Sequence, residues 1–201
     1  MPRTLIFDLG NVLIQFDFRR GYEAIRKYCP FPAEELSQRI ASTGIVHRLE
    51  SGEMPAAEFF ARFSEALHLN LTYEEFRELW GAIFLPDPII PESTIASLAR
   101  SYRLLLLSNT NGIHFEFLEA HYPILKHFHG RVLSHEVKAM KPDPAIYRAA
   151  LELAGCAAEE CFYTDDIPAY VDGAKRLGLD AVLFTGTQQL EIELRRRGVS
   201  I

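Results

Sequence analysis

Four places along the chain carry side chains that could bind a metal ion and a phosphate group. Asp8, Ser108 and the pair Asp165-Asp166 each follow a short apolar run, and Lys141 stands in the sequence Lys-Pro-Asp-Pro. Two adjacent carboxylates raise each other's pKa unless a cation lies between them. The acidic pair therefore implies a metal ion, and the hydroxyl and the ammonium could hold the oxygens of an anion beside it.

Each of these residues also has a structural interpretation. Asp8 could simply end a strand, and Ser108 and Asp166 could each cap a following helix. Lys141 is harder to explain in that way, because Asp143-Pro144 predicts a helix start just after it. A cation at the positive end of a helix dipole is disfavoured unless an anion lies between the two.

The elements that must position these residues alternate between strand and helix. Five continuous apolar runs predict buried parallel strands, at residues 4–9, 104–107, 131–133, 161–164 and 181–185. Helical patterns lie at residues 92–102, 112–121, 144–154, 168–177 and 188–197. This order predicts an α/β fold with a Rossmann-like, doubly wound parallel sheet. Ligands of such sheets bind at the carboxyl ends of the strands, so the polar residues should share one edge.

The stretch of residues 17–91 has a different pattern, with amphipathic helices and no convincing strand. Apolar residues within 76–83 recur at helical spacing, and Thr72 with Glu75 has the spacing of a capping box. We interpret this stretch as an inserted helical bundle. The expected division is a core domain of residues 1–16 and 92–201 and a helical cap domain of residues 17–91.

The bulk properties describe an ordinary globular protein of 201 residues, 48% of them hydrophobic and 24% charged. The net charge of −6 argues against a nucleic-acid partner, because binding a phosphate backbone needs clustered Lys and Arg. No apolar run reaches the roughly 18 residues of a membrane-spanning helix, and no leader pattern is visible. We expect a cytoplasmic protein with reduced cysteines, no membrane contact and no obligate protein partner.

The order and the residues of the motifs resemble those of the haloacid dehalogenase superfamily over essentially the whole chain. The first motif of that family matches residues 7–12, the second matches 107–110, and the third, a Lys in Lys-Pro-x-Pro, matches 141–144. Its fourth motif, an acidic pair followed by Gly-Ala and Leu-Gly, matches 165–166 and 172–178. The resemblance also implies the helical cap, which one subfamily carries between the first and second motifs.

The resemblance implies a Mg²⁺-dependent phosphatase in which Asp8 attacks a phosphate monoester and forms a phospho-aspartyl intermediate. Asp8, the main-chain carbonyl of Gly10, Asp165 and Asp166 would hold the metal, whose preferred ligands are oxygens. A small phosphorylated molecule would be the substrate.

The phosphate group itself would be held by three residues that the resemblance also supplies. Lys141 would neutralise a phosphate oxygen and restrain the nucleophile. Ser108 and the main-chain N–H of Asn109 would donate to another oxygen at a helix N-terminus.

Two positions depart from the family pattern. Gly10 stands where the family carries the Asp that protonates the leaving oxygen, and Tyr170 stands where relatives usually carry Asn or Asp. A weak acid of the cap or of the substrate could substitute for that Asp, the substrate could have a good leaving group, or the protein could bind phosphate with little turnover. Bacterial phosphatases acting on glucose 1-phosphate are similar in their Asp-Leu-Gly-Asn-Val sequence, which favours a sugar phosphate such as a sugar 1-phosphate.

The same residues also bear on other functions. A metal-independent 2-haloacid dehalogenase tends to lack the acidic pair, and a receiver domain of the response-regulator type would lack the helical insertion. Five histidines crowd together, but zinc ligands come in tight pairs, so we interpret them as surface or core residues; they are His114, His121, His127, His129 and His135. A polar turn between cap helices was expected to select the substrate, through His47, Arg48 and Glu50.

Overall fold

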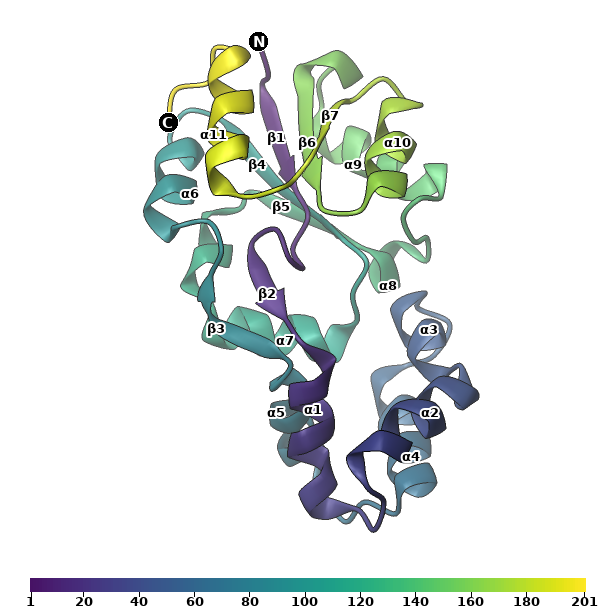
Figure 1. The fold of residues 1–201 in the computed structure, drawn as a ribbon. Coiled ribbons are helices and arrows are strands. Elements are labelled where there is room, and N and C mark those ends of the chain that lie inside the picture. The colour runs from purple at the N-terminus through teal and green to yellow at the C-terminus, as the bar shows by residue number, and fades with distance from the viewer.

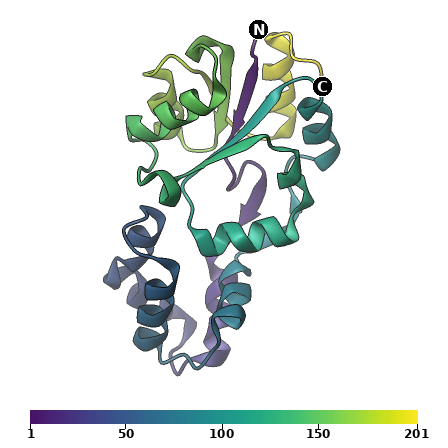
Figure 2. The same cartoon turned by 180° about the vertical axis from the view of Figure 1, so that it is seen from behind.

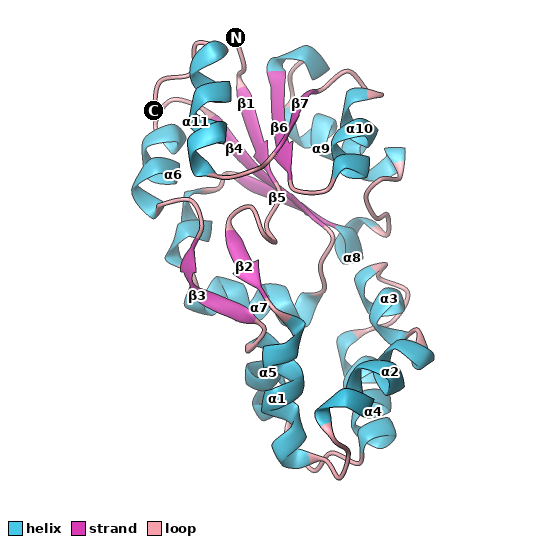
Figure 3. Cartoon of the chain, in the orientation of Figure 1, coloured by secondary structure: helices cyan, strands magenta, loops and turns pink.

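A computed structural model describes the backbone of residues 1–201 and the side chains of all but residues 33, 34 and 37. A five-stranded parallel sheet with the strand order β5-β4-β1-β6-β7 forms its centre (Figures 1 and 3). The strands are β1 (Thr4–Phe7), β4 (Arg103–Ser108), β5 (Gly130–Leu133), β6 (Cys161–Asp165) and β7 (Asp180–Leu183). The order runs outward in both directions from β1, which confirms the doubly wound α/β prediction.

Helices cover both faces of this sheet, and the alternation of side chains along β1 shows how. Leu5 and Phe7 point into one apolar cluster, whereas Ile6 points into the other. The first cluster is covered by α6 (Glu92–Ala99), α7 (Gly112–His121) and α11 (Thr187–Arg196), and the second by α9 (Pro144–Ala154) and α10 (Pro168–Lys175) (Figure 2). Because both faces are buried, the strands read as continuous apolar runs.

Five helices form a bundle below the carboxyl edge of the sheet (Figure 1). They are α1 (Phe18–Ile25), α2 (Ala33–Thr43), α3 (Ile45–Glu50), α4 (Ala56–Leu67) and α5 (Tyr73–Gly81). Phe59, Phe63, Phe76 and Trp80 pack at its centre. The capping box at the start of α5 is present, since Thr72 and Glu75 bond each other's main-chain N–H.

A two-stranded antiparallel ribbon carries the chain into and out of this bundle. It pairs β2 (Ile14–Phe16) with β3 (Phe84–Pro88). The expectation of no strand within residues 17–91 was therefore wrong. Pro86 and Pro88 favour a loop on sequence grounds, because proline cannot donate to a ladder. A ribbon of two strands has only edges, so both prolines are tolerated in it.

The bundle also rests directly on the core through α5 and α7. A Cβ atom at Gly81 would lie 2.3 Å from the ring of Phe117, so a side chain there would push the two helices apart. Trp80 stacks on His114 with 5.4 Å between ring centroids. Short elements complete the chain, namely η1 (Arg26–Tyr28), η2 (Pro123–His127), α8 (Ser134–Val137) and η3 (Ala158–Glu160). Among the described helices, none combines the length and apolar character that crossing a membrane would require.

Candidate active site

Three strand ends and one loop bring opposite charges into contact at the carboxyl edge of the sheet. The Lys141 ammonium donates to Asp8 Oδ1 at 2.7 Å, to Asp165 Oδ2 at 2.6 Å and to the Leu107 carbonyl at 3.1 Å. All three N–H groups of the ammonium are thus used. The side chains of Lys141, Asp8 and Asp165 are 1%, 9% and 0% exposed, so water screens this cluster little.

Asp166 adds a third carboxylate to the cluster. Ligand oxygens of Asp8, Asp165 and Asp166 lie within 4.8 Å of one another. Three carboxylates therefore face a single ammonium, which leaves an excess of negative charge. An oxygen-only donor set with this charge fits Mg²⁺, which prefers carboxylate and carbonyl oxygens, and the Gly10 backbone lines the same cavity.

The pKa shifts reflect this imbalance of charge. Burial raises the pKa of the Asp8 carboxyl, the Lys141 ammonium opposes that shift, and Asp165 adds to it. Burial also raises the pKa of Asp166, again helped by Asp165. For Lys141 burial favours loss of the proton, but Asp8 and Asp165 together outweigh it and raise the pKa of the ammonium. A bound divalent cation would relieve the repulsion between the carboxylates.

Asp165 is held from two further sides by groups that the sequence did not indicate. The Tyr163 hydroxyl donates to Oδ2, and the Ile167 main-chain N–H donates to Oδ1 at 2.9 Å. Tyr163 lies two residues earlier on the same strand, so its side chain points to the same face of the sheet. The interpretation of Asp166 as a helix cap was wrong, because Ile167 occupies the N-cap position of α10.

The segment after β4 positions Lys141 through a pair of hydrogen bonds. The Asn109 side chain accepts from the Lys141 main-chain N–H at 2.8 Å and donates to the Lys141 carbonyl at 3.0 Å. Only the main-chain N–H of Asn109 was expected to have a role. Ser108 is buried at the cavity wall, but it does not cap α7, whose N-cap is Asn111. The site is therefore a loop that precedes the helix, not the helix N-terminus that was predicted.

Tyr170, the second departure from the family pattern, covers the buried lysine. Its ring centroid lies 5.0 Å from the Lys141 Nζ, within the range of a cation–π contact. Its hydroxyl accepts from the Asn109 amide at 3.4 Å, and its carbonyl accepts from the Tyr147 hydroxyl at 2.8 Å. Tyr170 thus closes the side of the cavity next to Lys141.

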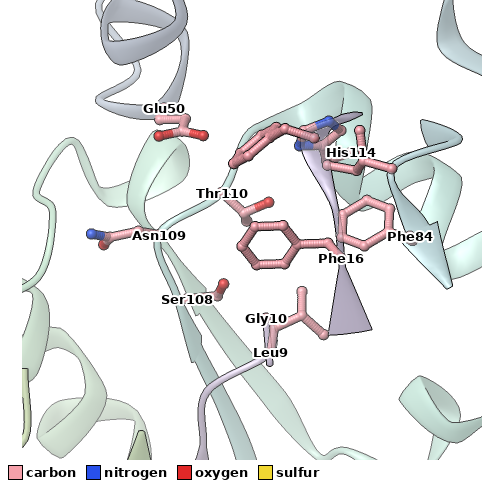
Figure 4. A pocket seen from close by; sticks show the side chains of 11 residues that line it. Leu9, Gly10, Phe16, Glu50, Phe84, Ser108, Asn109, Thr110 and His114 are labelled. Carbon is pink, nitrogen blue, oxygen red and sulfur yellow. The ribbon is translucent and has the colours of Figure 1, made fainter. Parts of the chain in front are cut away.

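A cavity of about 200 Å³ opens in front of the charged cluster. Its sheet side carries Asp8, Lys141 and Asp166, and its opposite side carries Phe16, Phe18 and Glu50. A smaller adjoining hollow of about 60 Å³ continues between Gly10, Phe16 and Glu50 (Figure 4). Its further lining is mostly apolar or aromatic and includes Leu9, Ile83, Phe84, Thr110 and His114.

The space beside Gly10 is filled by an aromatic ring. A Cβ atom at Gly10 would lie 2.7 Å from Phe16 Cε1, closer than ordinary packing allows. Phe16 reaches this place from the ribbon strand β2. The replacement of the expected acid by glycine is therefore accompanied by a side chain that excludes an acid from the same position.

The cap residues expected in a polar turn lie instead on a helix. His47, Arg48 and Glu50 belong to α3, so that part of the prediction was wrong. His47 is exposed, and Arg48 lies 3.9 Å from the Glu53 carboxylate. Glu50 lines both parts of the cavity, and burial raises the pKa of its carboxyl to about 7.

The five histidines of residues 114–135 do not gather at one place in the structure. Within the described residues, the one group of three metal-type ligands is Asp8, Asp165 and Asp166. His114 is buried against Trp80, and burial lowers the pKa of its imidazole to about 3. The other four histidines of residues 114–135 bond to separate groups, namely the Phe117 carbonyl (His121), Glu92 (His127), the Leu104 main-chain N–H (His129) and the Thr110 carbonyl (His135).

Comparison with known families agrees with this geometry. The family model described as haloacid dehalogenase-like hydrolase matches residues 2–178, which include all four motifs. The chain belongs to this hydrolase family. Among curated relatives of this haloacid dehalogenase-like hydrolase, D-ribitol-5-phosphate phosphatase of Bacteroides thetaiotaomicron is 26% identical over 186 residues, with 90% of each chain covered. A phosphorylated carbohydrates phosphatase of Thermotoga maritima is 26% identical over 191 residues, covering 89% of this chain and 83% of the relative.

Solved structures give the same family assignment. A haloacid dehalogenase family enzyme of Bacteroides thetaiotaomicron in complex with magnesium and inorganic phosphate matches with a TM-score of 0.82 and 27% identity, covering 92% of this chain and 96% of that chain. L-2-haloacid dehalogenase of Xanthobacter autotrophicus matches with a TM-score of 0.63 and 19% identity, covering 100% of this chain and 84% of that chain. The latter likeness extends to the fold alone.

Proposed function

We propose that this hydrolase is a Mg²⁺-dependent phosphatase that acts on a small phosphorylated carbohydrate through a phospho-aspartyl intermediate. The observation that carries the proposal is the buried contact of Lys141 with Asp8 and Asp165. Asp8, Lys141 and Asp166 line one cavity. Two of the relatives are named as phosphatases of a pentitol phosphate and of phosphorylated carbohydrates, which supports the substrate class.

The contacts of Asp8 support a separate role for each of its oxygens. Lys141 holds Oδ1, so Oδ2 is the oxygen that attacks phosphorus in line with the leaving group. Ser108 and the main-chain N–H of Asn109 donate to the phosphate oxygens, and Lys141 neutralises another of them. Water then attacks the phospho-aspartyl group and releases inorganic phosphate, which restores Asp8.

Asp8, the Gly10 carbonyl, Asp165 and Asp166 would hold the Mg²⁺ ion. When bound, the ion neutralises charge on the phosphate oxygens and orients the group for attack. Tyr163 and Ile167 fix the Asp165 carboxylate, so this donor is preorganised.

We further propose that residues 17–91 act as a cap domain over a core of residues 1–16 and 92–201. The cap supplies Phe18 and Glu50 to the cavity wall, and the ribbon strand β2 supplies Phe16. A wall of this kind would enclose the organic part of the substrate and exclude water from the phosphate. The acidic pair disfavours a metal-independent dehalogenase, and the helical bundle disfavours a receiver domain.

The test is Mg²⁺-dependent release of phosphate from a panel of sugar phosphates. The wild-type protein should turn over at least one of them, and Asp8→Asn should lower kcat by about 10⁴-fold or more, because the nucleophile is lost. Asp87→Asn, a change at an exposed aspartate on the ribbon, is the matched control and should act like wild type.

Thermal unfolding of Asp8→Asn should show a folded protein. Binding of phosphate without turnover of any ester by the wild-type protein would instead identify a phosphate-binding protein that lost activity with Gly10.

A further inference from the structure

The reaction needs a proton donor for the leaving oxygen, and position 10 cannot supply one. Gly10 has no side chain, and the Phe16 ring lies where a side chain would project. Among the described residues that line the cavity, the titratable groups outside the charged cluster are Glu50, Tyr170 and His114. The donor should be sought among these three.

Two of the three are poor donors for physical reasons. His114 is buried, its Nδ1 bonds to the Asn111 amide, and its low pKa keeps the imidazole neutral. Tyr170 lies over Lys141 and its hydroxyl contacts the Asn109 amide, so its side chain belongs to the sheet side of the cavity. Glu50 lies on the cap side, opposite the sheet edge (Figure 4).

The core fixes the backbone of Glu50 although the residue belongs to the cap. The Ser134 Oγ lies 2.7 Å from the Glu50 carbonyl and 3.0 Å from the Thr110 carbonyl, which share its one proton. The Ser134 Oγ also accepts from the Thr110 main-chain N–H at 3.0 Å. Ser134 is fully buried at the end of β5. One hydroxyl therefore connects Glu50 to the segment that carries Ser108 and Asn109.

The turn that follows Glu50 presses closely on the core. Gly52 has φ +74°, and a Cβ atom there would lie 2.3 Å from the His135 carbonyl oxygen. Only glycine fits both this conformation and this approach. The turn thus holds the end of α3 against the carboxyl edge of the sheet.

The surroundings of the Glu50 side chain suit proton transfer. No salt bridge to Glu50 is present in the described part of the chain, whereas Arg48 of the same helix pairs with Glu53. Phe16 and Phe18 line the cavity beside it. A carboxyl group that lies among aromatic rings and lacks a cation holds its proton near neutral pH, as a general acid must.

We propose that Glu50 is the general acid and base of this hydrolase, acting from the cap in place of a side chain at position 10. The inference rests on the proposed phosphatase function. In the first step Asp8 Oδ2 forms a bond to phosphorus, the bond to the leaving oxygen breaks, and the Glu50 proton passes to that oxygen to give an alcohol. In the second step the Glu50 carboxylate takes a proton from water, the water oxygen bonds to phosphorus, and the bond to Asp8 breaks.

The test compares two leaving groups on the same protein. Glu50→Gln should lower kcat/KM for an alkyl phosphate such as a hexose phosphate by about 10²-fold or more, because an alkoxide needs a proton as it leaves. For para-nitrophenyl phosphate, whose leaving group needs no proton, kcat/KM reports formation of the phospho-enzyme and should change less than about threefold.

Glu53→Gln, an exposed glutamate of the following turn, is the matched control and should leave both values unchanged. Gly52→Ala should move α3 away from the core and reproduce the selective loss seen with Glu50→Gln.

The outcomes separate this inference from the proposed function. Equal losses with both substrates would overturn the acid role and make Glu50 a binding residue, and no loss with either would also overturn it. If the wild-type protein released phosphate from neither substrate, the proposed function would fail and the acid role with it. Thermal unfolding of Glu50→Gln checks that the variant is folded.

Discussion

The two walls of the cavity are built on different principles. The sheet wall holds Lys141, Asp8 and Asp165 in mutual contact, with every N–H of the ammonium used and little exposure to water. The opposite wall holds Glu50 among Phe16 and Phe18, and Phe18 is 44% exposed. The first wall fixes a cation between two of its carboxylates, whereas the carboxyl of the second wall has no ion-pair partner in the described part of the chain.

This difference gives the two walls separate roles in binding the substrate. A wall whose cation and carboxylates are fixed by mutual contacts is preorganised for the phosphate group, whose charge and shape are the same in every substrate. A wall from a separate helical bundle can differ without disturbing that chemistry, and it meets the part of the substrate that varies. The missing acid at Gly10 was replaced, in our proposal, by moving the proton donor from the first wall to the second.

The largest expected effect comes from removing the cation of the sheet wall. Lys141→Met would leave Asp8 and Asp165 buried and facing each other, which should cost about 3–5 kcal/mol of unfolding free energy without metal. Mg²⁺ should restore part of this loss, because the ion replaces the missing charge. Urea unfolding with Mg²⁺ and with a chelator measures both effects.

Lys126→Met is the control, because Lys126 is exposed. If Lys141→Met and Lys126→Met were equally stable in the presence of chelator, the sheet wall would not depend on internal charge compensation.

A smaller effect is expected from returning the acid to the sheet wall. In the Glu50→Gln background, Gly10→Asp alone should not restore turnover of an alkyl phosphate, because Phe16 occupies the space. Gly10→Asp combined with Phe16→Ala should restore about tenfold or more, since general acid catalysis is worth about 10²–10⁴. Phosphate release from a hexose phosphate measures the recovery.

Phe16→Ala alone in the same background is the control for the enlarged cavity. If Gly10→Asp restored phosphate release without Phe16→Ala, the Phe16 ring would move aside readily and would not exclude an acid from position 10.

The smallest expected effect concerns the uncompensated carboxyl of the cap wall. Burial raises the pKa of Glu50 from 4.5 to about 7, so the folded state holds this proton more tightly than the unfolded state. The resulting stability is full below the unfolded pKa and is lost as the pH rises through the folded pKa. As the pH rises from the unfolded pKa to the folded pKa of Glu50, the unfolding free energy of wild type should fall relative to that of Glu50→Gln. The difference should be on the order of 1 kcal/mol after solvent screening.

Urea unfolding of both proteins at about pH 5 and about pH 8 measures the difference. The charged groups across the cavity, Asp8, Asp166 and Lys141, are common to both proteins and cancel in the comparison. A difference that does not change with pH would mean that the Glu50 carboxyl is not desolvated.

The sequence by itself determined the sheet and the residues at its carboxyl edge. Continuous apolar runs are diagnostic when both faces of a strand are buried, and residues that end parallel strands must share one edge. Asp8, Ser108 and the pair Asp165-Asp166 were found on these grounds, and Lys141 by its place just before a predicted helix start. The family resemblance added Asn109 and the Gly10 carbonyl. Their roles at the metal and phosphate remain proposals.

The sequence did not indicate the contacts that cross between distant segments. The ribbon of β2 and β3 was missed because Pro86 and Pro88 argue locally against a strand, and only pairing across the whole inserted bundle makes one. The place of Phe16 beside Gly10 depends on that ribbon. Glu50 was expected in a turn, and its place at the cavity depends on a hydroxyl 84 residues away in the chain. The local sequence pattern indicates which residues are buried and whether a segment has helix or strand periodicity. Contacts between distant segments depend instead on how the bundle packs on the core.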